Sequence, residues 1–238
     1  MRGWPKSLRH GWYLAVAGLH AVIVLHIPVL AIGIPLWATL HTKAPPLIVG
    51  PLIVMNTILV ILLQVPLSRG TETRAGGVRA LRLAALSLAG CAVAIAFADR
   101  LDAVGATVLL AVGMVALTLG EVLQVAGGIG VSYDLAPRER QGEYLAVFWL
   151  GVAAMYMVGP ALITVGVVEN GSVGWLGFAA LLLVAGFLVR PAAEAASAQI
   201  RRAHEDTAHD NTAHDDTAHE NTARENTVEK GGAVEHAK

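Results

Sequence analysis

The chain has 238 residues, of which 55% are hydrophobic and 15% are charged, and its 17 Lys and Arg nearly balance its 18 Asp and Glu. A soluble domain usually has about 25% charged residues, so this composition argues against an ordinary soluble globular domain. Charged residues are dense after Arg190, whereas residues 11–189 carry few of them outside short gaps. This division predicts an apolar membrane domain followed by a water-exposed tail.

Six apolar segments are long enough to cross a bilayer, which takes about 20 residues in a helix. Helix is the expected state because backbone polar groups in lipid must be hydrogen-bonded within their own segment. We therefore expect an all-α membrane protein with six transmembrane helices, and we expect Pro28 and Pro35 to break the first one. In chain order the segments cover residues Gly11–Leu40, 47–67, 79–98, 103–133, 143–168 and 174–189.

The Lys and Arg residues outside these segments predict how the protein is oriented. Most of them lie at the amino terminus, in the gaps 68–78 and 134–142, and after the last segment, which six crossings place on one side. The opposite side has only Lys43 and Arg100. Because cytoplasmic loops carry an excess of Lys and Arg, we expect a multi-pass protein of the cell (inner) membrane with both termini in the cytoplasm.

Four regions follow from this pattern. We expect a cytoplasmic amino terminus over 1–10, the six-helix domain over 11–190, a juxtamembrane helix over 191–203 and a tail over 204–238. The tail contains a five-residue repeat without large apolar residues, which predicts disorder. Metal binding by its histidines is the weaker interpretation, because five residues turn a helix by about 140° and point successive histidines in different directions. These histidines are His204, His209, His214 and His219.

Enzyme motifs are absent from the sequence, which has no HExxH, GxSxG, CxxC or GxxxxGK[ST] pattern. Six helices suit an intramembrane serine protease, but the deep serines Ser87 and Ser132 lie in no GxSxG turn. The single Cys91 lies in an apolar run and allows no disulfide framework. We therefore expect neither an enzyme nor a cofactor, a metal site or a nucleic-acid partner.

Ionisable side chains inside the spans are the first candidates for a functional site, because a charge at a helix centre costs about 2.5–3.5 kcal/mol on insertion scales. Glu121 lies deep in the fourth segment. A cavity-facing carboxyl there is suited to carrying a proton or binding a cationic group; the alternative is a structural carboxyl hydrogen-bonded between helices. His26 lies next to Pro28 and is a candidate for a proton relay, with a helix-packing histidine as the alternative.

Polar and basic residues elsewhere complete the candidate set. Asn56 in the second segment and Tyr156 in the fifth are candidates for contact with a small-molecule substrate. Asn56 is equally suited to a hydrogen bond between helices. Arg69, Arg74 and Arg138 lie in the gaps predicted to be cytoplasmic, where they would act as loop charges that latch or orient the helices.

Residues 120–124 read Gly-Glu-Val-Leu-Gln, and residues 134–144 read Asp-Leu-Ala-Pro-Arg-Glu-Arg-Gln-Gly-Glu-Tyr. Together with Gly159-Pro160, they resemble helices ten and eleven of a major facilitator superfamily transporter. Residues 68–77 look like the basic, glycine-bearing loop between helices eight and nine of that family.

The second segment adds to this resemblance. Asn56 with Gln64 and Pro66 is similar to helix eight of bacterial drug-efflux-type members, and the whole resemblance covers residues 8–190. It implies the C-terminal six-helix half of such a transporter, with two inverted three-helix repeats and alternating access about a midplane site. On this mapping the helices that carry His26 and Glu121 line the cavity.

The resemblance implies movement of a small solute across the membrane, coupled to protons, with efflux as one direction. The family has two six-helix halves, so three alternatives stay open for this chain. It corresponds to a fragment of a twelve-helix transporter, to a half that pairs with a second copy or a separate half, or to a non-transporting half with a structural or regulatory role.

Overall fold

The computed structural model describes residues 10–202; the predictions for residues 1–9 and for the repeat-containing tail lie outside this range. Within it there is no strand, and six helices are long and apolar enough to cross a membrane. The expected all-α architecture with six such helices is confirmed. The helices are Gly11–Leu40, Pro46–Ser68, Arg74–Ala98, Ala103–Leu135, Arg138–Val168 and Gly171–Arg202.

The first span is interrupted next to Pro28, as its sequence predicts. Proline has no backbone N–H and its ring crowds the preceding turn, so the regular α-helical hydrogen-bond pattern cannot continue through it. The chain winds into a π-helical segment directly after Pro28, and Pro35 lies in the first turn of the next piece. The pieces are α1 (Gly11–Val24), α2 (His26–Pro28), the π-helical segment Val29–Gly33 and α3 (Ile34–Leu40).

The other spans are more regular, except that a π-helical segment follows the Gly159-Pro160 step in the fifth span. Short polar caps fix two helix starts: Thr73 Oγ1 accepts the N–H of Gly76 at 3.1 Å, and Asp102 Oδ1 accepts the N–H of Gly105 at 2.9 Å. The elements are α4 (Val49–Ser68), α5 (Arg74–Ala98), α6 (Ala103–Leu135), α7 (Gln141–Ala161), the π-helical segment Leu162–Val168 and the last helix, Gly171–Arg202.

The last helix is longer than its apolar segment predicts. The expected span ends at 189 and the expected juxtamembrane helix covers 191–203, whereas one continuous helix reaches Arg202. Residues 191–200 are rich in alanine, the best helix former, so nothing in this stretch stops the helix when charged residues begin. The six-helix bundle belongs to the first of two compact units, Met1–Ala196.

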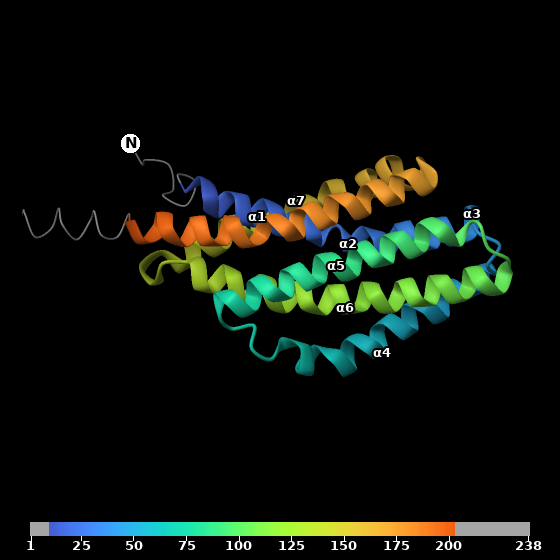
Figure 1. The fold of residues 1–238 in the computed structure, drawn as a ribbon, viewed down its shortest axis with the longest axis horizontal. Helices are drawn as coiled ribbons and strands as arrows, with labels where there is room; N and C mark the ends of the chain where they lie inside the picture. Colours follow the sequence, from blue (N-terminus) through green and yellow to red (C-terminus); the bar gives the residue numbers. More distant parts are fainter. Residues whose placement is uncertain (1–9, 203–238) are drawn as a thin grey trace, which may run out of the picture. The chain divides into compact units, whose positions relative to one another are not determined.

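Small residues bring α5 and α6 close together (Figure 1). A Cβ atom built on Gly127 would lie 2.8 Å from the carbonyl oxygen of Gly77, and one built on Gly120 would lie 2.7 Å from Leu88 Cδ2. Glycine at these positions allows two membrane helices to approach with their backbones nearly in contact. This packing fixes the position of α6, the helix that carries Glu121.

The remaining contacts place α4 at the edge of the bundle (Figure 1). It packs mainly on α6, while α1 packs on α7. Only Leu52 and Asn56 of α4 are buried, and large apolar residues such as Ile58 and Leu62 are exposed. Exposed apolar side chains are suited to contact with lipid, so the position of α4 in a bilayer depends on few contacts with protein.

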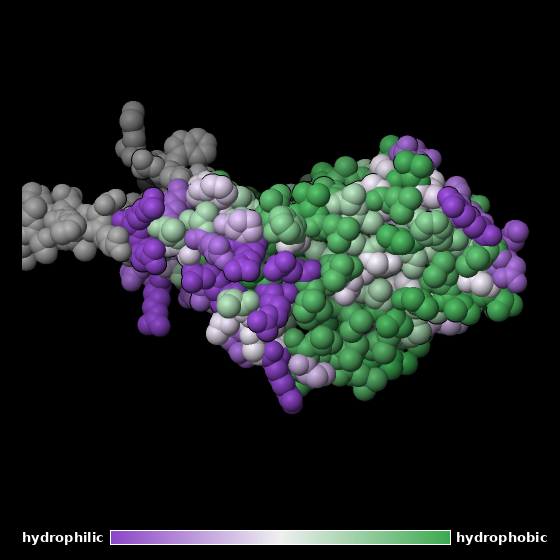
Figure 2. Space-filling view, viewed as in Figure 1, coloured by the Kyte–Doolittle hydropathy of each residue, from purple (hydrophilic) through white to green (hydrophobic). Residues whose placement is uncertain are grey.

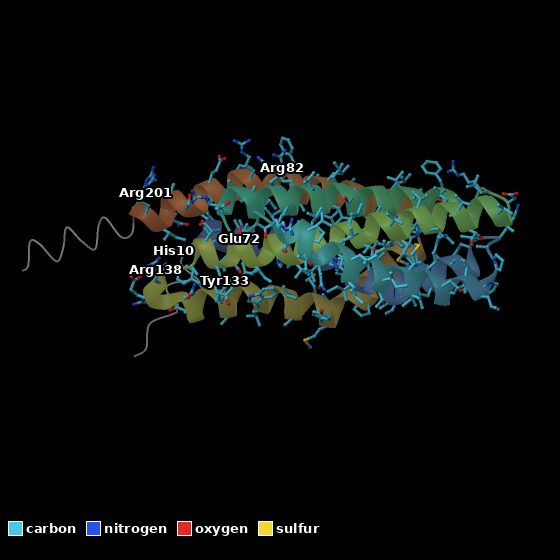
Figure 3. The ribbon with its side chains drawn as sticks, turned by 90° about the horizontal axis from the view of Figure 1, so that it is seen from below. His10, Glu72, Arg82, Tyr133, Arg138 and Arg201 are labelled. Carbon is cyan, nitrogen blue, oxygen red and sulfur yellow. The ribbon has the colours of Figure 1, made fainter. Side chains whose placement is uncertain are left out.

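Hydrophobic residues cover most of the visible surface of the helices, and hydrophilic ones gather toward the end where α5 begins (Figure 2). Arg138, Tyr133 and His10 lie toward the same end of the bundle (Figure 3). The connections between helices that contain Lys and Arg are therefore grouped at one end of the bundle, which is the arrangement expected of six antiparallel crossings.

Candidate functional site

Asn56 joins Glu121 and Thr118 across the interface between α4 and α6. Its Nδ2 donates to Glu121 Oε2 at 2.9 Å and to Thr118 Oγ1 at 3.0 Å, and the threonine hydroxyl donates to the carbonyl of Met114 at 2.8 Å. Both amide hydrogens of Asn56 are thereby used, so the orientation of its side chain is fixed. Asn56 is 5% exposed and Thr118 is fully buried, whereas Glu121 is partly exposed.

Helix geometry accounts for this grouping on the α6 side. Thr118 and Glu121 are three residues apart and therefore lie on the same face of the helix. Asn56 is the single buried polar residue of α4 and lies opposite that face. Two of the expected site residues, Asn56 and Glu121, are thus brought together, and Thr118 joins them without having been predicted.

His26 lies in the first span within electrostatic range of Glu121. It is 2% exposed, and its Nδ1 lies 3.0 Å from the carbonyl oxygen of Ile23. A carbonyl can only accept, so Nδ1 carries the hydrogen, and in the neutral ring Nε2 is the acceptor. The neutral ring thus keeps a basic nitrogen, but no hydrogen bond joins it to Glu121 among residues 10–202, so a proton would pass between them through intervening water.

A second buried polar pair lies one turn further along α6. Gln124 Nε2 and His20 Nε2 are 2.7 Å apart, and both side chains are buried. The ring of His20 also contacts Phe148 and Trp149 of α7, with centroid distances of 4.7 and 5.9 Å. His20 Nδ1 is buried and has no hydrogen-bond partner among the residues described.

The pair of His20 and Gln124 is not among the candidate residues of the sequence analysis. The available signal is Gly128, four residues after Gln124: a Cβ atom at that position would collide with the ring of His20. The missing side chain of Gly128 leaves room for the imidazole from the first span.

The two broken spans meet beside this region. A Cβ atom on Gly159 would lie 2.9 Å from Pro28 Cγ, and one on Gly33 would lie 2.9 Å from Ile163 Cγ2. The π-helical segments of the first and fifth spans are therefore in contact, and the first of them begins three residues after His26. Short π-helical segments within α-helices are frequent at functional sites.

Tyr156 is not brought to this cluster. It lies on α7 and is 57% exposed, and within residues 10–202 its hydroxyl forms no hydrogen bond. A role in substrate contact would require a solute or a partner on that outer face. Tyr144 and Phe148 of α7 do lie inside the bundle, and the backbone carbonyl of Tyr144 accepts the hydroxyl of Tyr13 at 2.7 Å.

The three loop arginines differ in their partners. Arg74, at the start of α5, forms an ion pair with Asp134 near the end of α6, with Nε and Oδ2 3.9 Å apart. Both side chains are more than a third exposed, so the pair contributes little to stability. Arg69 and Arg138 are exposed and form no ion pair in the described part of the chain.

The cluster offers a carboxyl group, an amide and an imidazole, a set suited to proton binding and to polar contact with a small solute. Residues 10–202 contain no group of three side chains able to hold a metal ion. The four histidines of the tail lie outside that range. Comparisons of the chain with protein-family models, with curated proteins and with solved structures found no match.

Proposed function

We propose that this protein is a six-helix half of a major facilitator-type transporter that moves a small solute coupled to protons. Glu121 is the proton-carrying group, His26 is its partner in proton transfer, and Asn56 holds the carboxylate and contacts the solute. The observation that carries the proposal is the state of Glu121. This carboxyl lies within a span, is partly exposed, and forms no salt bridge with any described residue.

A carboxyl group in this position is expected to exchange protons when its surroundings change. Charge inside a membrane span is costly unless it is paired or hydrated. When water reaches Glu121 the ionised form is tolerated, and when the site closes the protonated form is favoured. Access and protonation are therefore coupled at this residue, which is the minimum requirement of a proton-coupled carrier.

Because Asn56 is hydrogen-bonded to Glu121, protonation of Glu121 is expected to affect the packing of α4. A hydrogen bond to an ionised carboxylate is roughly twice as strong as one between neutral groups. Protonation of Glu121 therefore weakens the contact that holds α4 on α6. Since α4 has few other buried residues, its position is expected to respond to the protonation state.

The packing of the spans supports a bundle of two three-helix repeats. The second span packs on the fourth as the fifth packs on the first. The third packs on the fourth through glycines, and the sixth reaches the first through Trp175 and Trp37, whose rings are 5.9 Å apart. In two three-helix repeats, the first, second and third spans correspond to the fourth, fifth and sixth. The contact of the second span with the fourth then corresponds to that of the fifth with the first, and the contact of the third with the fourth to that of the sixth with the first, as expected for repeats of this kind.

The proposal includes a second six-helix body, either a second copy of this chain or a separate half. Glu121 is partly exposed beside α4, so one bundle does not enclose it. The rival function is a non-transporting half with a structural role. It is favoured by the complete use of the Asn56 donors within the bundle and by the outward position of Tyr156.

Solute-driven proton flux separates the two functions. The full-length protein is reconstituted into liposomes loaded with a pH-sensitive dye, and a panel of small cationic, neutral and anionic solutes is added. We expect at least one solute to drive proton movement with the unmodified protein. Glu121→Gln should reduce this flux to that of protein-free liposomes, and Glu72→Gln, at an exposed carboxyl before α5, should leave it unchanged.

Persistence of the flux in Glu121→Gln would remove Glu121 from the coupling mechanism. Absence of flux for every solute with the unmodified protein would favour the structural half. Mass photometry of the protein in detergent checks the second body: a dimer supports pairing of two copies, and a monomer that transports nothing supports dependence on another chain.

A further inference from the structure

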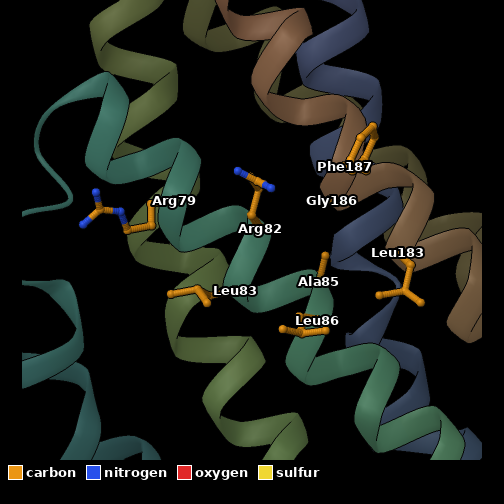
Figure 4. Close-up of a pocket in the computed structure, with 8 residues that line it drawn as sticks. All are labelled: Arg79, Arg82, Leu83, Ala85, Leu86, Leu183, Gly186 and Phe187. Carbon is orange, nitrogen blue, oxygen red and sulfur yellow. The ribbon is translucent and has the colours of Figure 1, made fainter.

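A groove with a basic mouth and an apolar floor lies between α5 and the last helix (Figure 4). Its volume is about 440 Å³. Arg79 and Arg82 line one part, and Leu83, Leu86, Leu183 and Phe187 line the rest. None of these residues belongs to the cluster around Glu121.

Small residues form the floor of the groove. Gly186 of the last helix faces Ala85 of α5 so closely that a Cβ atom on the glycine would lie 2.5 Å from the alanine Cβ. The two helices therefore touch along this line, and the longer side chains on either side form the walls. The walls are open to the surroundings of the bundle, since Leu86 is 59% and Phe187 is 72% exposed.

A second cavity of about 440 Å³ adjoins the first, and Arg79 and Arg82 line both. Arg74, Arg190 and Glu194 also line the second cavity. Four arginines and one carboxylate thus line this end of the groove, which leaves a net positive charge there.

Two of these four arginines lack a carboxylate partner. Arg190 pairs with Glu194 at 2.9 Å and Arg74 with Asp134 at 3.9 Å, whereas Arg79 and Arg82 form no ion pair with any residue in 10–202. Arg79 and Arg82 are three residues apart on one helix, a spacing at which like charges repel. An anion between them would remove the repulsion and supply the missing partner.

The depth of Arg82 strengthens the argument. It lies eight residues after the first residue of α5, which is about 12 Å along the helix axis. Leucines line the groove on one side of it and charged residues line the other, and Figure 4 shows its guanidinium group on the side of α5 nearer the last helix, whereas that of Arg79 points away from that helix. A positive charge at the border of the apolar region is stabilised by reaching an anion at the bilayer surface.

We propose that this groove binds an anionic phospholipid. The phosphate lies at Arg82, Arg79 turns its flexible side chain toward it, and an acyl chain lies along Leu83, Leu86, Leu183 and Phe187. A free phosphate ion would satisfy the charge and leave the apolar walls uncovered, and a zwitterionic lipid would cover the walls and bring its own cation toward the arginines. An anionic phospholipid matches both parts of the groove, as basic pockets between membrane helices do.

Native mass spectrometry of the full-length protein in detergent tests the proposal. The protein is mixed with dioleoyl-phosphatidylglycerol or with dioleoyl-phosphatidylcholine, which have the same acyl chains and differ in net charge. We expect bound phosphatidylglycerol at concentrations where phosphatidylcholine is not retained. In the double variant Arg79→Gln and Arg82→Gln, the affinity for phosphatidylglycerol should fall by roughly an order of magnitude or more.

Matched variants identify the cause of any loss. Arg79→Lys with Arg82→Lys keeps the charge and should retain most of the binding. Arg69→Gln with Arg138→Gln removes two exposed arginines outside the groove and should leave binding unchanged. Circular dichroism and the elution volume from size exclusion report whether each variant keeps its helices and its size.

Four results would overturn the proposal. Equal retention of the two lipids by the unmodified protein would show that charge is not recognised. Unchanged binding in the Gln double variant, or an equal loss in the Arg69 and Arg138 variant, would place the lipid elsewhere. Complete displacement of phosphatidylglycerol by inorganic phosphate at constant ionic strength would show a simple anion site in which the acyl chain has no part.

Discussion

The side-chain amide of Asn56 donates a 2.9 Å hydrogen bond to Glu121 Oε2, and this bond links α4 to α6. The two residues are 65 positions apart in the chain. Asn56 is the one polar residue that α4 buries, so the bond joins the least-packed span to the helix at the centre of the bundle. Charge on Glu121 and the position of α4 are thereby connected through one contact.

Asn56→Ala should lower the free energy of unfolding by about 1–2 kcal/mol, because Glu121 and Thr118 lose a buried partner. Unfolding in mixed detergent with increasing dodecyl sulfate measures the change. Thr57→Ala, at the neighbouring exposed residue, is the control and should have a smaller effect. Combining Asn56→Ala with Glu121→Gln should cost less than the sum of the single changes, since Glu121→Gln weakens the bond that Asn56→Ala removes. Simple additivity would show that the carboxylate of Glu121 does not strengthen this bond.

In the proposed mechanism Glu121 carries the coupled proton, and infrared difference spectra recorded with and without a transported solute test this assignment. Protonation converts a carboxylate into a carboxylic acid, whose C=O stretch is separate from the amide bands. We expect a carboxylic acid band that disappears in Glu121→Gln and persists in Glu72→Gln. Retention of the complete band in Glu121→Gln would assign it to another carboxyl group.

Gly128→Ala should destabilise the bundle, because the added Cβ atom meets the ring of His20 and forces α1 and α6 apart. Overpacking of this kind costs about 1–3 kcal/mol. Gly177→Ala in the last helix is the matched control, since nothing lies within 4 Å of its Cβ position. Unfolding of the two variants side by side checks the difference. Equal stability of both would mean that His20 moves aside without cost.

Asp134→Asn should change the free energy of unfolding by less than about 1 kcal/mol, because the pair with Arg74 is long and exposed. The same dodecyl sulfate titration measures this variant, with Ser132→Ala as a buried comparison on α6. A large loss of stability in Asp134→Asn would show that the pair contributes more than its length and exposure indicate. The loop arginines would then hold the bundle together more strongly than their exposure indicates.

The break of the first span could be predicted from Pro28 alone, because proline acts on the turn in which it lies. The same holds for the number of spans, which depends on runs of about 20 apolar residues. The sequence predicts a helix over 191–203 after the last apolar segment, and the structure joins the two in one helix, since hydropathy marks where lipid contact ends and not where helical hydrogen bonding ends. The alanine-rich residues after 190 continue the helix past the apolar run.

The partners of the polar residues could not be predicted in this way. The sequence identifies Asn56, Glu121 and His26 as unusual within apolar segments, but it does not say which of them meet. Amphipathic soluble helices reveal their inner face by an apolar stripe. The spans here are apolar all round, so that signal is missing.

The sequence by itself therefore determined six apolar spans, their order, the break at Pro28 and the residues whose burial is costly. Only the tertiary structure decided that Glu121 meets Asn56, that His20 meets Gln124 and that Tyr156 faces outward. The physical reason is the solvent. Lipid exerts no hydrophobic pressure that would turn one face of a span inward, so glycine contacts and a few hydrogen bonds set the rotation of each helix.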